Sequence, residues 1–197
     1  MIRKTIIKST LLVAAIALSV QSQAVPSAEA LSYTCAGCHG TNGASTGDAI
    51  PSIAGLSSTY LVDAMKAYKN DERDPTIMNR IAKGYSEEQF ELMGSFFEAQ
   101  EVHKNRDQTF DVAKAAKGKK LHNKYCSKCH TDAGIVAEDD AGQLSGNAKL
   151  FLQYSLADFH DGTRSQEKKM KKKIKKMLKR DKEAFDLIVN YYVSGKK

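Results

Sequence analysis

The chain has 197 residues, enough for one or two domains, and a formal net charge of +7. No segment beyond the first 24 residues is apolar enough to cross a bilayer, so we expect the mature protein to lack a transmembrane span. Residues 25–105 hold 6 basic and 11 acidic side chains, a net of −5, whereas residues 106–197 hold 21 and 12, a net of +9. Such an asymmetry bears on partners rather than on fold.

Residues 1–24 combine a basic start, an apolar run from Leu11 to Val20, and small side chains at Ser22 and Ala24. This pattern predicts a secretory signal peptide that is cut after Ala24. A cut after Ala30 would shorten the first helix, and an uncleaved anchor is the other alternative, although the apolar run is short for a span. We therefore expect export to the periplasm.

The four cysteines occur in two pentads, "CAGCH" (Cys35, Cys38, His39) and "CSKCH" (Cys126, Cys129, His130). The C-x-x-C-H pattern marks the attachment of c-type haem. Two cysteines three positions apart lie on one face of a helical turn, from which their sulfurs reach the two vinyl groups of a haem. The histidine that follows is then placed to bind the iron. Two pentads predict two covalently bound haems.

Other uses of these cysteines fit less well. A zinc site built from both pairs would have 88 positions between Cys38 and Cys126, far more than zinc ribbons use. Thioredoxin-like chemistry needs a βαβ context, for which there is no strand pattern. Two structural disulfides would leave both histidines without a role.

The periodicity predicts an all-α fold. Each half is expected to have a helix that leads into the pentad, an amphipathic helix after it and a closing helix. In the first half the amphipathic and closing helices are expected at 58–69 and 86–100. In the second half the three helices are expected at 112–130, 148–160 and 181–193. Ser86 and Gln89 suit a capping box at the start of the first closing helix. Glycine-rich loops such as 40–55 connect the helices.

An internal repeat divides the chain. A shift of 91 positions carries Cys35 onto Cys126, and it also carries "IAG" at residues 53–55 onto "LSG" at residues 144–146. The same shift carries Arg73 onto Arg164. We therefore predict a tandem pair of cytochrome c domains, each wrapped around one haem; the boundaries are 1–24 for the signal peptide, 25–100 for the first domain, 101–111 for a polar linker and 112–197 for the second domain.

Each iron needs a sixth ligand, and methionine is usual in electron-carrying cytochromes c. In the first domain Met65 and Met93 lie on apolar helical faces, which favours core packing. Met78 lies in a segment that we expect to be a loop after Pro75, where a ligand can be placed more freely. We predict Met78 as the ligand.

In the second domain the candidates lie in a lysine-rich run, "KKMKKKIKKMLKR", residues 168–180. Met170 lies 40 residues after His130, close to the 39-residue spacing in the first domain, and we predict it as the ligand. Met177 is at helical spacing from Ile174 and is expected in the core. Most of the lysines are interpreted as a solvated helix face. Nucleic acid is not expected as a partner, because no aromatic residues are interleaved in the run.

The mature chain resembles the dihaem cytochrome c subunit of flavocytochrome c sulfide dehydrogenase. The segments that carry the resemblance are "CAGCHGTNG", "TIMNRIAKGYS", "KLHNKYCSKCH", "LQYSLADF" and "EKKM". The resemblance implies a heterodimer with an FAD-binding flavoprotein that oxidises sulfide, and an external acceptor such as a small cytochrome. It implies haem attachment at Cys35, Cys38, Cys126 and Cys129, and iron ligation by His39, Met78, His130 and Met170.

Electron transfer without catalysis by this chain alone is the expected activity. If all four cysteines are thioether-linked, none is left for redox chemistry, and no G-x-G-x-x-G follows a strand, so FAD is expected only on the partner. A free dihaem cytochrome c that shuttles electrons to a terminal oxidase is the alternative. A haem-dependent sensor or adhesin is a third class, disfavoured if both irons are six-coordinate.

Overall fold

The computed structural model describes residues 26–74, 76–105, 107–137 and 141–195, so the predicted signal peptide lies outside the described part of the chain. The fold is mostly helical, as predicted. Its helices are α2 (Ala28–Tyr33), α3 (Ala36–His39), α4 (Ser58–Lys69), α5 (Met78–Ala82), α6 (Glu87–Glu98), α7 (Val112–Tyr125), α8 (Lys149–Asp161), α9 (Lys168–Arg180) and α10 (Ala184–Val193).

Short elements that the sequence did not predict follow each pentad. Single 3-10 turns occur at Thr41–Gly43 and Asp132–Gly134, and two antiparallel strands of two residues each, β1 (His130–Thr131) and β2 (Val136–Ala137), flank the second turn. Elements this short lie below what hydrophobic periodicity can detect. They leave the helical fold class unchanged.

Local signals account for several helix boundaries. The Ser86 side chain accepts from the Gln89 backbone N–H at 3.3 Å, and the Ser86 backbone N–H donates to Gln89 Oε1 at 2.9 Å. The predicted capping box at α6 is therefore confirmed. Asp111 caps α7 by accepting from the Lys114 backbone N–H at 2.8 Å. Helix α7 therefore begins directly after Asp111.

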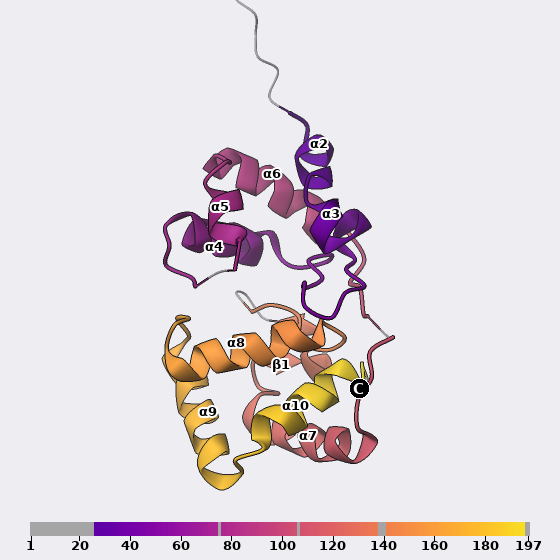
Figure 1. The fold of residues 1–197 in the computed structure, drawn as a ribbon, viewed down its shortest axis with the longest axis vertical. Coiled ribbons are helices and arrows are strands. Elements are labelled where there is room, and N and C mark those ends of the chain that lie inside the picture. Colours follow the sequence, from indigo (N-terminus) through magenta and orange to yellow (C-terminus); the bar gives the residue numbers. More distant parts are fainter. Residues whose placement is uncertain (1–25, 75, 106, 138–140, 196–197) are drawn as a thin grey trace, which may run out of the picture.

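The helices form two groups, each with its own hydrophobic cluster (Figure 1). Figure 1 shows α2 to α6 as one group and α7 to α10 as the other, with α4 and α8 on the sides that face each other. The first cluster is centred on Phe90 and Phe97, and the second on Ile188 and Tyr192. In the second group α7 and α10 cross so closely that a Cβ on Gly118 would clash with the Leu187 carbonyl.

The same backbone hydrogen bonds recur in the two groups 91 positions apart. In the first group the N–H groups of Ile53 and Ala54 both donate to the Gly43 carbonyl, at 2.9 and 3.2 Å. In the second group Leu144 and Ser145 donate to the Gly134 carbonyl, at 2.8 and 3.1 Å. The two segments that follow the pentads are therefore folded alike.

Several hydrogen bonds join the two groups. The Ser52 backbone N–H donates to Asn147 Oδ1 at 3.1 Å, and the Leu150 N–H donates to the Asp48 carbonyl at 2.7 Å. Asn105, in the predicted linker, is buried and donates from Nδ2 to the Thr46 carbonyl at 2.8 Å. The linker thus packs between the groups rather than crossing open solvent.

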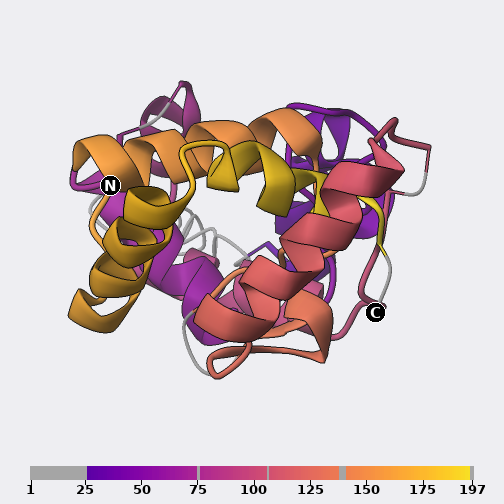
Figure 2. The ribbon, with the colours of Figure 1, turned by 90° about the horizontal axis from the view of Figure 1, so that it is seen from below.

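The lysine-rich run forms α9, which lies at the edge of the second group in both ribbon views (Figures 1 and 2). Ile174 and Met177 are its buried residues, and its lysines are exposed. The prediction of a solvated face for these lysines is therefore confirmed. Among the described residues, none of the helices has the length and apolarity that a membrane span requires.

Candidate haem-binding sites

The first pentad lies in one helical turn that follows α2. The backbone N–H groups of Cys38 and His39 donate to the Cys35 carbonyl at 3.2 and 2.9 Å. Cys35 is half-buried against the first cluster, whereas Cys38 is exposed. All four cysteines lie in the described part of the chain and none is in a disulfide, so both thiols of the pentad are available for thioether bonds.

The His39 imidazole is already oriented by the glycine-rich loop. Its Nδ1 lies 2.8 Å from the Pro51 carbonyl oxygen. Because a carbonyl only accepts, Nδ1–H donates and Nε2 is left with a free lone pair. Burial lowers the pKa of His39, although the bond to Pro51 opposes this, and the imidazole is held in the neutral form that a metal needs. The residues around the first pentad therefore fit covalent attachment of haem with His39 as an iron ligand.

The second pentad repeats this geometry. The backbone N–H groups of Cys129 and His130 donate to the Cys126 carbonyl at 3.1 and 3.0 Å. Cys126 is half-buried and Cys129 is exposed, the same pattern as in the first pentad. The difference is that His130 begins β1 instead of ending a helix. The main-chain turn that brings the three side chains together is nevertheless preserved.

The Cys35 and Cys126 thiols are poor candidates for thiolate chemistry. Burial raises the pKa of the Cys126 thiol to about 11, and burial also raises the pKa of Cys35. Such thiols are protonated at neutral pH, whereas a nucleophile or a zinc ligand must be a thiolate. The described residues also contain no group of three or more His, Cys, Asp or Glu side chains arranged around a metal-sized site.

Met78 and Met170 are both half-buried, but neither lies in a loop. Met78 is the first residue of the short helix α5, and Met170 is in the first turn of α9. The expectation of a loop position for Met78 is therefore wrong. The helix at Met170 forms because Ile174 and Met177, at helical spacing, are buried on one face of the lysine run. Ligation of iron by either methionine stays a prediction.

The three methionines that were assigned to core packing do pack there. Met93 is 5% exposed in the first cluster, and Met177 is 2% exposed in the second. Met65 is half-buried against the first cluster. The prediction of core packing is therefore confirmed for these three methionines.

Two tyrosines that the sequence did not single out tie the pentads to distant segments. Tyr85, which follows α5, shares a 2.9 Å hydrogen bond with Thr34, the residue before Cys35. Tyr192, in α10, lies 3.1 Å from His122 Nδ1 and also bonds Cys126. Both contacts join residues more than 50 positions apart, so only the fold reveals them.

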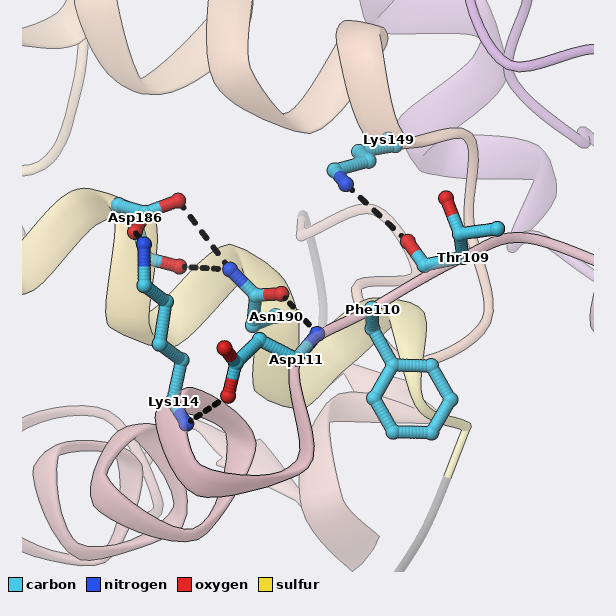
Figure 3. Close-up of a pocket in the computed structure, with 7 residues that line it drawn as sticks. All are labelled: Thr109, Phe110, Asp111, Lys114, Lys149, Asp186 and Asn190. Atoms are coloured by element: carbon cyan, nitrogen blue, oxygen red, sulfur yellow. Dashed lines mark hydrogen bonds and ion pairs between the residues drawn. The ribbon is translucent and has the colours of Figure 1, made fainter.

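A hollow beside the end of the linker does not belong to these sites (Figure 3). Its polar groups are already paired: Lys114 Nζ lies 2.6 Å from Asp186 Oδ2, and the Asp111 backbone N–H donates to Asn190 Oδ1 at 2.7 Å. Lys149 Nζ donates to the Thr109 carbonyl at 3.1 Å. These bonds fasten the linker to α7, α8 and α10, which indicates a structural role.

The chain matches the family model described as "Cytochrome c" over residues 27–113. It is 34% identical over 71 residues to cytochrome c-554(548) of Halomonas halodenitrificans, covering 34% of this chain and 86% of that protein. It is 48% identical over 69 residues to the cytochrome subunit of sulfide dehydrogenase of Chlorobaculum tepidum. That match covers 35% of this chain and 62% of the subunit, so the chain spans less than two thirds of that relative.

Two further proteins resemble the chain over most of its length. The thiosulfate dehydrogenase electron acceptor of Stutzerimonas stutzeri is 25% identical over 169 residues, which cover 77% of this chain and 78% of that protein. The crystal structure of cytochrome c4 from Pseudomonas stutzeri superposes with a TM-score of 0.71 at 22% identity. The superposition covers 86% of this chain and 99% of that chain, and it shows that both groups of helices share the fold of a single known structure.

Proposed function

Because this chain belongs to the cytochrome c family, we propose that it is a periplasmic dihaem electron-transfer subunit that accepts electrons from a sulfide-oxidising FAD flavoprotein. Family membership implies covalently bound c-type haem. Two haems are proposed because the two pentads share the same main-chain turn and the same exposure of their cysteines. The electrons then pass to an external acceptor such as a small cytochrome.

The bound haem supplies an iron that gains and loses one electron. The chain's own residues hold and tune it. Cys35 and Cys38 attach one haem and Cys126 and Cys129 the other. The Pro51 carbonyl fixes the tautomer of His39 so that Nε2 can bind iron.

Methionine as the sixth ligand raises the reduction potential and closes the iron to other molecules. We assign this role to Met78 in the first half and to Met170 in the second, where they would hold the iron together with His39 and His130 respectively. Both methionines lie at the start of a helix and are half-buried. With the sixth position filled, the chain carries electrons and does not itself transform a molecule.

The flavoprotein partner is supported chiefly by one observation, the 48% identity to a cytochrome subunit of sulfide dehydrogenase. The resemblance of "TIMNRIAKGYS" and "EKKM" to that family points to the same partner. Export is supported by the signal-peptide pattern of residues 1–24.

A second candidate donor is a thiosulfate-oxidising dehydrogenase. It is favoured by the similarity to a thiosulfate dehydrogenase electron acceptor, which extends over 77% of this chain. This chain would carry electrons in the same way, and only the electron donor would differ.

Reduction of the purified holoprotein distinguishes these donors. The native protein is isolated under mild conditions and its visible spectrum is recorded for a flavin contribution. We expect a flavoprotein to copurify, and sulfide to reduce the haems much faster with that flavoprotein than without it. Reduction by thiosulfate and its dehydrogenase, with no flavin in the complex, would support the second candidate. A protein that is isolated alone and reduced by neither donor would favour the free shuttle to a terminal oxidase.

A further inference from the structure

Two arginines at matching positions occupy the boundary between the two groups of helices. Arg73 follows α4 and Arg164 follows α8, 91 positions later. The Arg73 backbone N–H donates to the Ala67 carbonyl at 3.2 Å, and the Arg164 N–H donates to the Asp158 carbonyl at 3.3 Å. The same local turn is therefore built twice, and each copy presents one arginine.

The two guanidinium groups are held in the same way. Arg73 lies over the ring of Tyr68, with its central carbon 4.6 Å from the ring centre, and Arg164 lies over Phe159 at 4.3 Å. Tyr68 and Phe159 are also 91 positions apart. Stacking on an aromatic ring fixes the plane of a guanidinium and leaves its N–H edge free to bind an anion.

Both arginines converge on one hydroxyl group. Arg164 Nη2 lies 3.5 Å from Tyr60 Oη, and Arg73 also bonds this hydroxyl. Burial would raise the pKa of Tyr60, but the charges of Arg73 and Arg164 lower it below its usual value. A Cβ on Gly142 would lie 2.8 Å from Tyr60 Oη, so the second half of the chain closes over the hydroxyl.

Neither arginine forms a salt bridge with a described carboxylate, although Asp158 lies near enough to Tyr68 to act on its pKa. In the part of the chain that the structure describes, the ion pairs are Lys66–Glu87, Lys83–Asp71 and Lys114–Asp186, and none includes Arg73 or Arg164. Burial and the nearby charge of Arg73 lower the pKa of Arg164. Two half-buried like charges this close are unfavourable unless an anion joins them.

We propose that Arg73 and Arg164 form one anion-binding site at the boundary between the two halves, and that it holds propionate carboxylates of both haems. The proposal rests on the proposed function only in requiring a haem at each pentad. Guanidinium groups bind carboxylates through two parallel hydrogen bonds, which suits propionates. Tyr60 and Tyr68 pack against the same cluster as Cys35, which connects the arginines with the first haem site.

A shared site has a measurable consequence for the reduction potentials. A guanidinium near the haems disfavours the ferric state, because ferric haem carries one more positive charge than ferrous haem. Replacing either arginine with a neutral residue should therefore lower the potentials of both haems. An arginine that served only its own half would lower one of them.

The test is a spectroelectrochemical titration of the full-length holoprotein, which uses an electrode and needs no partner protein. Arg73→Gln and Arg164→Gln should each lower both potentials, and Arg73→Lys and Arg164→Lys should retain most of the wild-type values. Arg80→Gln is the matched control, because Arg80 is exposed and lies only two residues after Met78. It should shift either potential much less than the other two glutamine variants.

Three results would overturn the proposal. One is a shift in the Arg73→Gln and Arg164→Gln proteins no larger than in Arg80→Gln. Another is a shift confined to the haem of the substituted half. The third is a Tyr60→Phe protein in which both potentials rise, because this loss of negative charge would show that a Tyr60 tyrosinate is the counter-ion of the arginines. If the arginine variants shift both potentials as predicted but no flavoprotein reduces the wild-type protein, the anion site stands and only the proposed function is overturned.

Discussion

Met170 and Met177 lie seven residues apart on one helix but in different surroundings. Met170 is half-buried in the first turn of α9, whereas Met177 is 2% exposed within the second hydrophobic cluster. If Met170 binds iron, Met170→Ala should remove about half of the weak far-red absorption band that a methionine sulfur gives on ferric haem, since one haem of two keeps its methionine. The measurement is the absorption spectrum of the oxidised protein.

Met177→Ala is the matched control for this experiment. It should leave the far-red band intact and lower the free energy of unfolding by about 2–5 kcal/mol, the usual range for truncating a buried methionine. The reverse pattern, with the band lost in Met177→Ala and kept in Met170→Ala, would show that the ligand assignment is wrong.

His122 predicts a dependence of stability on pH. Its side chain is 2% exposed, and burial lowers its pKa from 6.5. The folded chain therefore binds a proton at His122 less readily than the unfolded chain does. The free energy of unfolding should fall as pH drops below about 6.5, and this contribution should end below the folded pKa.

The measurement is chemical denaturation of wild type and His122→Phe between about pH 7 and pH 5. Phenylalanine keeps a ring beside Tyr191 and Tyr192 but cannot take up a proton. The variant is less stable at pH 7, because the bond from His122 to Tyr192 is lost, but its stability should fall less steeply with acid. Equal slopes in the two proteins would contradict the prediction.

For single residues, the sequence was most informative where a function depends only on neighbouring positions in the chain. The pentads are recognisable because the spacing of two cysteines and a histidine alone determines what they can bind. The Pro51 carbonyl that orients His39 could not be predicted, since any backbone carbonyl in the glycine-rich loop could have taken that place. Arg73 and Arg164 were seen as a repeated pair, but their convergence on Tyr60 depends on how the two halves pack.

Among the helices, α6 offers the clearest test of a local signal. The reciprocal bonds between Ser86 and Gln89 satisfy two backbone N–H groups at its start. Ser86→Ala should lower the free energy of unfolding by about 1 kcal/mol, the typical cost of losing an N-cap side chain. Denaturant unfolding measures the change.

Ser95→Ala, an exposed substitution in the same helix, is the control for the cap. Because it removes no capping bond, it should change stability by less than about 0.5 kcal/mol. If both substitutions had the same effect, the capping box would not be stabilising α6 in solution.

Helix α9 concentrates positive charge on the exposed side of the second half. Eight lysines and one arginine surround two methionines, an isoleucine and a leucine, with no acidic residue in the helix. We predict that this field steers an acidic electron acceptor toward Met170 and that salt weakens the steering, because the Debye length falls from about 10 Å at 0.1 M to about 3 Å at 1 M. Changing Lys171, Lys172 and Lys173 to Gln should slow oxidation at low salt and flatten its salt dependence.

Stopped-flow oxidation of the reduced protein by an acidic acceptor cytochrome, across a salt series, measures this effect. The control changes Lys117, Lys120 and Lys124 to Gln, which removes the same charge from exposed positions on α7. Both triple variants have the same net charge, so a rate loss specific to α9 identifies the docking surface. If wild type and the α9 variant have equal oxidation rates and equal salt dependence, the lysine run is only a solvated helix face and does not steer the acceptor.

Elements with a strong period were predicted well, and those without one were not. The helix at 58–69 was predicted with the bounds that α4 has, and the lysine run was expected to present a helical face. The strands β1 and β2 escaped prediction because two residues carry no period. Met78 was expected in a loop because the helix α5 spans only five residues.

The way in which the two halves join is a property of the whole molecule that the sequence left open. The predicted linker is polar, as a flexible connection would be, yet Asn105 is buried and bonds the Thr46 carbonyl of the first half. Asn147 is 2% exposed and accepts from the Ser52 N–H across the boundary. Buried amides that bond main-chain groups of another segment look like ordinary surface residues in a sequence, because their partners are far away along the chain.

The central claim, that one chain carries electrons on two six-coordinate haems, is tested most directly by counting electrons. The mature holoprotein is titrated anaerobically with a calibrated reductant while its haem absorption is followed, and carbon monoxide is added to the reduced form. We predict two electrons taken up per chain, in two one-electron steps, with no change in spectrum on adding carbon monoxide. Uptake of a single electron, or a ferrous haem that binds carbon monoxide readily, would contradict the account.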